Sequence, residues 1–158
     1  MGAGKSAVGR YLARTLHLSF VDSDDEIEKR TGVDIPFIFE KEGETGFRNR
    51  EAVVIDDLSK MDGIVLATGG GAITAEDSRS RLGGRGFVVY LYTTVEQQVS
   101  RTQRGRERPL LDNDDPRATL EALLATRDPM YREIADMVVE TDGRKVNSVA
   151  NEIIEQIS

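Results

Sequence analysis

Met1-Gly2-Ala3-Gly4-Lys5-Ser6 opens the chain, and its last three residues complete the phosphate-binding pattern G-x-x-x-x-G-K-[ST]. Glycine has no Cβ atom, so Gly2 and Gly4 allow successive backbone N–H groups to turn toward an anion. Lys5 adds a positive charge for the outer phosphates, and the Ser6 hydroxyl can ligate Mg²⁺. A flexible N-terminal stretch is the alternative interpretation.

The residues after the glycines favour a phosphate-binding loop. Val8, Leu12 and Leu16 recur every four positions, which predicts a helix with one apolar stripe directly after the loop. Such a helix directs its free N-terminal N–H groups at the same anion. The full pattern also requires a glycine two residues before Met1, at the end of a buried strand, and we expect this strand to be absent.

Length and composition limit the class of protein. A chain of 158 residues predicts one domain, and the absence of cysteine excludes disulfides and thiol catalysis. There is no signal peptide and no apolar run near the ~18 residues of a membrane span, so we expect a cytoplasmic protein. A net charge of −7 argues against general nucleic-acid binding. An anionic substrate therefore has to meet a local group of cations, and the clearest is Arg101, Arg104, Arg106 and Arg108.

Two carboxylates follow the first predicted strand. Ser19-Phe20-Val21 is apolar enough for a short strand, and Asp22-Ser23-Asp24 comes directly after it. Open α/β sheets bind ligands at this end of their strands. Because successive side chains of a strand diverge, we expect Asp22 and Asp24 to have different tasks. The alternative is that one of them only caps the next helix.

Residues 25–58 predict a small helical lobe. The helices are expected at 25–30, 35–42 and 44–58, with breaks at Gly32 and Gly43. Its apolar contacts are expected from Pro36, Phe37, Ile38, Phe39 and Phe47. Taken alone, Arg48 indicates a solvated helix residue, because Glu44 and Glu51 lie within helical reach of it.

A second buried strand is predicted at Ile64-Val65-Leu66-Ala67, and Gly69-Gly70-Gly71 follows it. Three consecutive glycines at a strand end offer free N–H groups and room for a ligand, although a flexible turn is the alternative. The remaining pattern predicts a helix around Leu82 that ends before Gly83, a strand at 87–92, and a helix from the capping box 94–97 to about 103. A basic loop at 104–109 then suits a mobile lid over phosphates, and the sole histidine, His17, is expected at the surface.

The last third of the chain continues the alternation of helices and strands. Asp115-Pro116 starts a helix, and Asp128-Pro129 is expected to restart it. A strand is predicted at 137–140 and a final helix through 146–157. The fold class is therefore α/β with a parallel sheet. The absent first strand would leave two open sheet edges, so we expect the chain as written to fold poorly alone.

Six motifs in this order resemble those of shikimate kinase along essentially the whole chain. They are Gly2-Ala3-Gly4-Lys5-Ser6, Asp22-Ser23-Asp24, Gly46-Phe47-Arg48, Thr68-Gly69-Gly70-Gly71, Arg108-Pro109-Leu110-Leu111 and Arg127-Asp128-Pro129-Met130-Tyr131. The resemblance implies a P-loop, nucleoside-monophosphate-kinase-like three-layer fold with strand order 2-3-1-4-5, from which strand 1 is missing. It also implies a single domain over 1–158, with a substrate lobe at about 25–58 and a lid at about 103–115.

The resemblance further implies transfer of the γ-phosphate of MgATP to the 3-hydroxyl of shikimate, in the route to aromatic amino acids. Residues implied to bind the nucleotide are Gly2, Ala3, Gly4, Lys5, Ser6, Ala7, Arg101, Arg108 and Arg144. Ala7 stands where the family usually has threonine. Ser6 and Asp22 are implied to hold Mg²⁺. Residues implied to bind shikimate are Asp24, Arg48, Gly69, Gly70, Gly71 and Arg127, and the implied catalytic residues are Lys5, Asp24 and Arg108.

The resemblance suggests a monomer whose only partner is a small molecule, without nucleic acid or membrane. Two other functions stay open at this point. A kinase for another polyol acid such as gluconate is one, although Arg48 and Arg127 together with the glycine triplet speak against it. A non-catalytic nucleotide-binding protein is the other, because half of the phosphate-binding pattern is missing.

Overall fold

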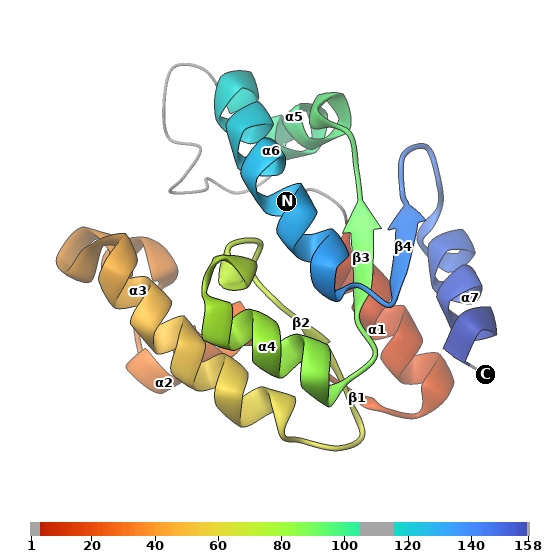
Figure 1. Cartoon of the computed structure of the whole chain (residues 1–158), viewed down its shortest axis with the longest axis horizontal. Coiled ribbons are helices and arrows are strands. Elements are labelled where there is room, and N and C mark those ends of the chain that lie inside the picture. Colours follow the sequence, from red (N-terminus) through yellow and green to blue (C-terminus); the bar gives the residue numbers. More distant parts are fainter. Residues whose placement is uncertain (1–3, 105–115, 158) are drawn as a thin grey trace.

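The structure is a computed structural model that describes residues 4–104 and 116–157. Helices and strands alternate along it, as the sequence predicts (Figure 1). In chain order the elements are α1 (Lys5–Leu16), β1 (Ser19–Asp22), α2 (Ser23–Thr31), α3 (Ile35–Ser59), β2 (Ile64–Ala67), the 3-10 helix η1 (Ala72–Thr74), α4 (Glu76–Arg85), β3 (Val89–Tyr92), α5 (Val95–Arg104), α6 (Pro116–Ile134), β4 (Met137–Glu140) and α7 (Val146–Ile157). None of the helices in these two ranges is long and apolar enough to cross a bilayer.

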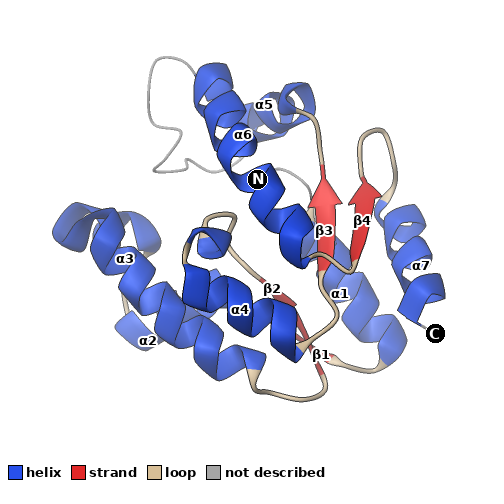
Figure 2. Ribbon diagram, in the orientation of Figure 1, coloured by secondary structure: helices blue, strands red, loops and turns tan. Residues whose placement is uncertain are grey.

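The strands of the described residues form two separate parallel pairs (Figure 2). β1 pairs with β2, from Ser19 opposite Ile64 to Asp22 opposite Ala67. β3 pairs with β4, from Val89 opposite Met137 to Tyr92 opposite Glu140. The predicted order places one missing strand between these pairs. This order is confirmed, because residues of β2 and β3 line one cavity, so these are the strands that face each other between the two pairs.

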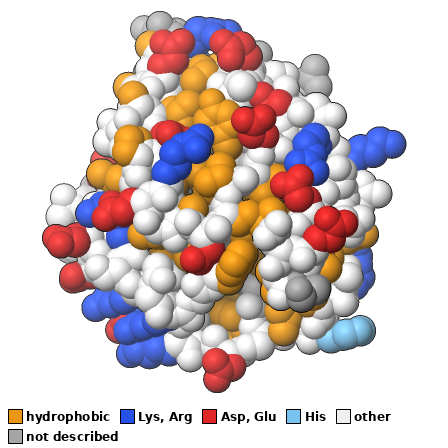
Figure 3. Space-filling view, turned by 45° about the vertical axis from the view of Figure 1, so that its right-hand side comes forward, with side chains coloured by type: hydrophobic (Ala, Val, Ile, Leu, Met, Phe, Trp, Pro, Cys, Tyr) orange, Lys and Arg blue, Asp and Glu red, His pale blue; other side chains and the backbone are white. Residues whose placement is uncertain are grey.

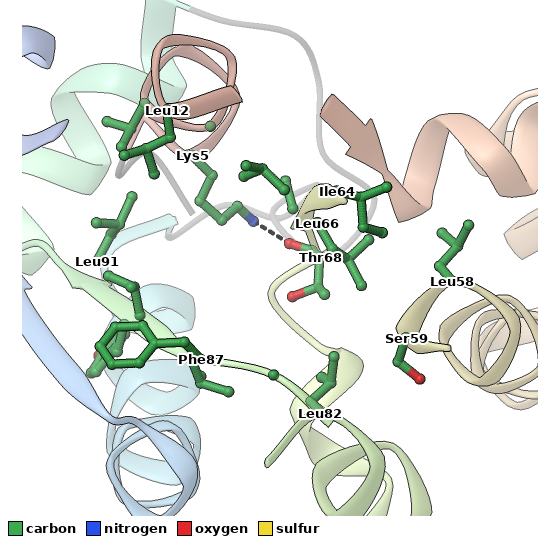
Figure 4. A pocket seen from close by; sticks show the side chains of 18 of the residues that line it. Lys5, Leu12, Leu58, Ser59, Ile64, Leu66, Thr68, Leu82, Phe87 and Leu91 are labelled. Carbon is green, nitrogen blue, oxygen red and sulfur yellow. Dashed lines mark hydrogen bonds between the residues drawn. The ribbon is translucent and has the colours of Figure 1, made fainter. Parts of the chain in front are cut away.

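A cavity of about 460 Å³ lies where the two pairs face each other. Its walls include β2, β3 and the inner face of α1, and Figure 4 shows Leu12, Leu66 and Leu91 around it. Figure 3 shows apolar side chains reaching the surface in a band between charged ones. Among the large apolar residues that remain exposed, Phe87 and Met61 line the same cavity and are each about half exposed.

α1 and α7 pack together beside the second strand pair. Val8 and Leu12 of α1 are buried in one cluster with Val149 and Ile153 of α7 and with Val139 of β4. The stripe predicted for the first helix is therefore a core face. α1 ends at His17, which caps it in the left-handed conformation with φ 58° and is exposed, as predicted.

α2 and α3 form a second packed unit with its own core. Ile27, Ile38, Phe47, Val54 and Leu58 are buried together. The predicted break at Gly43 is present inside α3, where φ is 71° and ψ is −177°. The predicted contact of Phe37 is wrong, because 44% of this residue is exposed.

Two predicted boundaries between residues 80 and 90 differ from the structure. α4 continues through Gly83 and Gly84 to Arg85 instead of ending before them. Gly83 has a packing reason, since a Cβ atom there would lie 3.3 Å from the Ile134 side chain of α6. The third strand begins at Val89, not at Phe87, because β4 offers only four residues to pair with it.

α6 runs without interruption from Pro116 to Ile134, so the predicted restart at Asp128-Pro129 is wrong. Proline lacks an N–H group, so it removes one helical hydrogen bond, that to the carbonyl of Ala125. Packing of α6 against α4, α5 and η1 outweighs that loss.

Candidate active site

The N-terminus of α1 meets the end of β2. Gly4 precedes the helix in the left-handed conformation, with φ 79° and ψ 27°, and no side chain of the described residues caps this end. Lys5 Nζ donates a hydrogen bond of 2.7 Å to the carbonyl oxygen of Thr68, just beyond β2 (Figure 4). This end of α1 therefore presents three kinds of hydrogen-bond donor: the first-turn N–H groups, the Lys5 ammonium and the Ser6 hydroxyl. Donors of these kinds bind phosphate.

The two aspartates at the end of β1 have different surroundings, as expected. Asp22 caps α2: its Oδ1 accepts hydrogen bonds from the N–H groups of Asp24 at 2.8 Å and Asp25 at 3.3 Å. Asp22 therefore does cap the helix, and its role toward a metal ion stays a prediction. Asp24 lies in the first turn of α2, and its Oδ1 would be 2.8 Å from a Cβ atom at Gly69.

Two of the three glycines lie close to side chains of the site. A Cβ atom at Gly69 would also lie 3.2 Å from Glu51 Oε2, and one at Gly71 would collide with the guanidinium group of Arg48. Gly71 has an ordinary φ of −92°, so its conformation does not demand glycine. The side chains of Asp24, Glu51 and Arg48 thus converge on Gly69 and Gly71.

The backbone groups of the triplet are only partly as predicted. The Gly69 N–H donates to Ser23 Oγ at 3.3 Å, so it is already used inside the protein. The N–H groups of Gly70 and Gly71 have no acceptor among the described residues. These two N–H groups are the ones predicted to hold a ligand.

Arg48 is held from both sides on α3. Its Nη1 donates to Glu51 Oε1 at 2.8 Å, and its Nη2 lies 3.4 Å from Glu44 Oε1. The Arg48 side chain is 17% exposed and that of Glu51 is 3% exposed, so the solvated interpretation of Arg48 is wrong. Arg48 Nε and Glu51 Oε2 are buried without a hydrogen-bond partner among the described residues. Such atoms indicate a place for a polar ligand or water.

Glu51 is the functional candidate that sequence reasoning missed. Burial raises its pKa; the Arg48 and Arg127 guanidinium groups oppose this shift, and the Asp24 carboxylate adds to it. A signal was present in the sequence, because Phe47, Glu51, Val54 and Leu58 share one helical face and the other three are core residues. A carboxylate in such a stripe is seldom buried unless it has a partner.

α6 brings the second arginine to the same place. Arg127 is 5% exposed and close enough to Glu51 to lower the pKa of its carboxyl. The Arg127 guanidinium is also close enough to Tyr131 to lower the pKa of its hydroxyl, and that hydroxyl donates to the Gly70 carbonyl oxygen. Asp24, Arg48 and Arg127 therefore meet at residues 69–71, although they come from three different helices.

Of the remaining predicted nucleotide residues, the structure describes the side chains of Ala7 and Arg144 only. Gly2, Ala3 and Arg108 lie outside the described residues, as does almost all of the predicted lid, and of Arg101 only the backbone, in α5, is described. Ala7 is exposed on α1. The Arg144 guanidinium donates to the Glu140 carbonyl oxygen at 3.1 Å and lies 3.0 Å from Glu152, so it ties β4 to α7.

The described ranges contain no group of three or more His, Cys, Asp or Glu residues that could hold a metal ion. This result fits Mg²⁺, which keeps several waters and uses only one or two protein ligands beside substrate phosphates. Ser6 and Asp22 supply a hydroxyl and a carboxylate of the required kind near the end of β2.

Comparison with known proteins gives matches of one kind. The family model described as shikimate kinase matches residues 1–158. A shikimate kinase of Shewanella denitrificans is 60% identical over 157 residues, which cover 99% of this chain and 92% of the relative. A solved structure, shikimate kinase from Acinetobacter baumannii in complex with shikimate, has a TM-score of 0.97 and 53% identity, covering 99% of this chain and 88% of that one. Shikimate kinase from Aquifex aeolicus has a TM-score of 0.83 and 34% identity, with 99% and 90% covered.

Proposed function

The chain belongs to the shikimate kinase family, and we propose that the cluster around residues 68–71 carries out that family's reaction. The reaction is the ATP-dependent phosphorylation of shikimate at its 3-hydroxyl group. One observation supports the assignment to this cluster most strongly. The phosphate-binding end of α1 and the pair Arg48 and Arg127 both meet the short stretch after β2, so a phosphate donor and an anionic acceptor can be held in contact.

The nucleotide phosphates are held at the N-terminus of α1 in this proposal. The left-handed Gly4 and the first-turn N–H groups face the phosphates, and Lys5 moves from the Thr68 carbonyl to a phosphate oxygen. Ser6 and Asp22 would hold Mg²⁺, which would neutralise phosphate charge when it is bound. Gly2, Ala3, Ala7, Arg101, Arg108 and Arg144 stay proposed nucleotide residues on the family resemblance alone.

The shikimate carboxylate is assigned to Arg48 and Arg127. A guanidinium group offers two parallel donors that match a planar carboxylate. Glu51 prevents the two arginines from repelling each other, because it lies beside both in the interior. The N–H groups of Gly70 and Gly71 complete the acceptor site with donors for the carboxylate or ring hydroxyls.

Asp24 is assigned to the reacting hydroxyl. The hydroxyl oxygen bonds to the γ-phosphorus as the bond from that phosphorus to its bridging oxygen breaks, and ADP leaves. Asp24 orients the hydroxyl and takes up its proton. A strong base is not required, because phosphoryl transfer depends mainly on positioning and on stabilisation of charge. Lys5 and Arg108 would supply that stabilisation.

The test is ADP release from MgATP with shikimate, with gluconate and with neither, using the 158-residue chain. We expect release that depends on shikimate. Faster release with gluconate would overturn the substrate assignment. Tight MgATP binding by calorimetry without release under any condition would support the non-catalytic alternative.

We also propose that the protein works as a cytoplasmic monomer on a small-molecule substrate. The monomer rests on the family resemblance, and the net charge of −7 supports a partner other than nucleic acid. Sedimentation analysis with and without MgATP and shikimate tests the monomer, and a dimer at working concentration would contradict it.

A further inference from the structure

Tyr131 occupies the junction between the second arginine and the glycine triplet. It follows Arg127 by four residues on α6, so both side chains lie on one face of that helix. Its hydroxyl donates to the Gly70 carbonyl oxygen, and the Arg127 guanidinium lies close enough to lower the pKa of that hydroxyl. A tyrosine hydroxyl has one proton to donate, and here that proton fixes the loop while its lone pairs face the side where Arg127 lies.

The hydroxyl is held in its neutral form. Burial raises the pKa of Tyr131, although the Arg127 and Arg48 guanidinium groups oppose this shift. A neutral phenol keeps the proton that the Gly70 carbonyl oxygen requires. Phenylalanine at this position would fill the same volume, but it would leave both the carbonyl group and Arg127 without this partner.

The ring of Tyr131 is fixed by a second tyrosine. The ring centroids of Tyr90 and Tyr131 are 4.6 Å apart, and Tyr90 Oη donates to Asp128 Oδ1 at 2.7 Å. β3 and α6 thereby hold the ring from two directions, and its hydroxyl is directed at Gly70. Side chains that orient a binding group in this way commonly set how tightly a site binds.

We propose that Tyr131 is a positioning residue for the acceptor site: it sets the distance and angle between the Arg127 guanidinium and the N–H groups of Gly70 and Gly71. This inference rests on the proposed function, because it assumes that those groups bind shikimate. We expect Tyr131 to affect the binding of shikimate and not that of the nucleotide, since the described contacts of its hydroxyl do not include α1 or Lys5.

The test compares Tyr131→Phe with the matched variant Tyr90→Phe. Both lose one buried hydroxyl, but only Tyr131→Phe loses the link to the glycine triplet. For Tyr131→Phe we expect a shikimate KM that rises roughly tenfold while the ATP KM stays within about twofold. Tyr90→Phe keeps the ring that packs on Tyr131 and loses only the hydrogen bond to Asp128, so for this variant we expect a lower melting temperature and a rise in the shikimate KM much smaller than that of Tyr131→Phe.

An unchanged shikimate KM in Tyr131→Phe would overturn the inference, as would an equal rise in both KM values. The dissociation constant of shikimate, measured by calorimetry at low temperature, keeps the test valid if the variant is unstable: unchanged affinity again overturns the inference. Wild-type protein that binds shikimate but does not phosphorylate it would instead count against the proposed function, and the affinity comparison would still decide the role of Tyr131.

Discussion

Arg48 is placed by ion pairs, and this placement gives the sharpest test of the acceptor site. Replacement by alanine removes a guanidinium group whose Nη1 lies 2.8 Å from Glu51. We expect Arg48→Ala to raise the shikimate KM by roughly thirtyfold or more, because partners of buried charge pairs are costly to remove. The ATP KM should change little, since Lys5 and the N-terminus of α1 are untouched.

Arg50→Ala is the matched control on the same helix. Arg50 pairs with Glu42 at 2.7 Å, but 46% of its side chain is exposed, and such surface pairs contribute little. Both KM values should stay near wild type in this variant. A loss of ATP affinity in Arg48→Ala as large as the loss of shikimate affinity would contradict the carboxylate assignment.

Glu51 predicts a pH dependence of stability. Burial raises the pKa of Glu51 above its ordinary value of 4.5, so the folded chain holds this proton more tightly than the unfolded chain. A raised pKa contributes stability that is fully present below the unfolded pKa and is lost as the pH rises through the folded pKa. The free energy of unfolding should therefore fall, relative to that of Glu51→Gln, as the pH increases from about 4.5.

Urea unfolding of both proteins across that range measures the difference. Other titrating groups act in both proteins, so subtraction removes most of their effect. A constant difference between the two curves would show that the Glu51 carboxyl has the same proton affinity in the folded and unfolded chains.

At the scale of the element, α3 depends on Gly43. Its φ of 71° with ψ of −177° belongs to a region that is essentially restricted to glycine. Gly43→Ala should lower the free energy of unfolding by about 1–3 kcal/mol. The break also turns the first part of α3 so that Ile38 reaches the core of Phe47 and Leu58. Arg48 follows the break, so the same change should raise the shikimate KM.

Gly84→Ala is the control, because the same substitution is expected to stabilise the protein at this position. It is exposed near the end of α4, and a Cβ atom there would meet nothing within 4 Å. Alanine is a better helix former, so Gly84→Ala should raise the free energy of unfolding by up to about 1 kcal/mol. Urea denaturation of the two variants tests both signs, and equal effects would contradict the assignment of strain to Gly43.

The elements also show where sequence reasoning succeeds. Glycines 32 and 43 marked the ends of helices correctly, and the strand at 137–140 was predicted to the residue, because those signals are local. The start of β3 and the continuity of α6 were not predictable, since they depend on the length of β4 and on packing around Pro129. Local patterns do not contain such partners.

In the candidate site, too, local motifs identified some residues, whereas others depend on packing that local patterns do not contain. Asp24, Arg48 and Arg127 were identified by motifs, and the structure brings them together at the glycine triplet. The burial of Glu51 and the attachment of Arg144 to α7 were missed, because each depends on which face of a helix the rest of the chain covers. The triplet itself was interpreted as a source of N–H groups, whereas two of its glycines also lie close to side chains of the site.

At the scale of the whole molecule, the two strand pairs face each other across an apolar cavity of about 460 Å³. β2 contributes four residues and β3 three residues to its walls, and no strand of the described residues pairs with their facing edges. Such edges favour the addition of another strand. Because Lys5 lies at the C-terminal end of β2, a strand that leads into α1 would run parallel to β2.

We therefore expect an added apolar strand to stabilise the chain. A Val- and Ile-rich segment of about five residues, joined before Met1 through a glycine placed two residues before Met1, should pair with both edges and fill the cavity. Each buried side chain contributes about 1.5–3 kcal/mol, and ordering each residue costs about 1–2 kcal/mol, so the net gain should be a few kcal/mol. The melting temperature should then rise by about 5–10 °C.

An extension of equal length with proline at alternate positions is the control, because proline cannot donate a backbone hydrogen bond to either edge. Equal melting temperatures for the two extensions would show that the cavity does not accept a strand. If only the apolar extension raises the melting temperature and also raises the kinase activity, closure of the sheet is linked to the geometry of Lys5 and the glycine triplet.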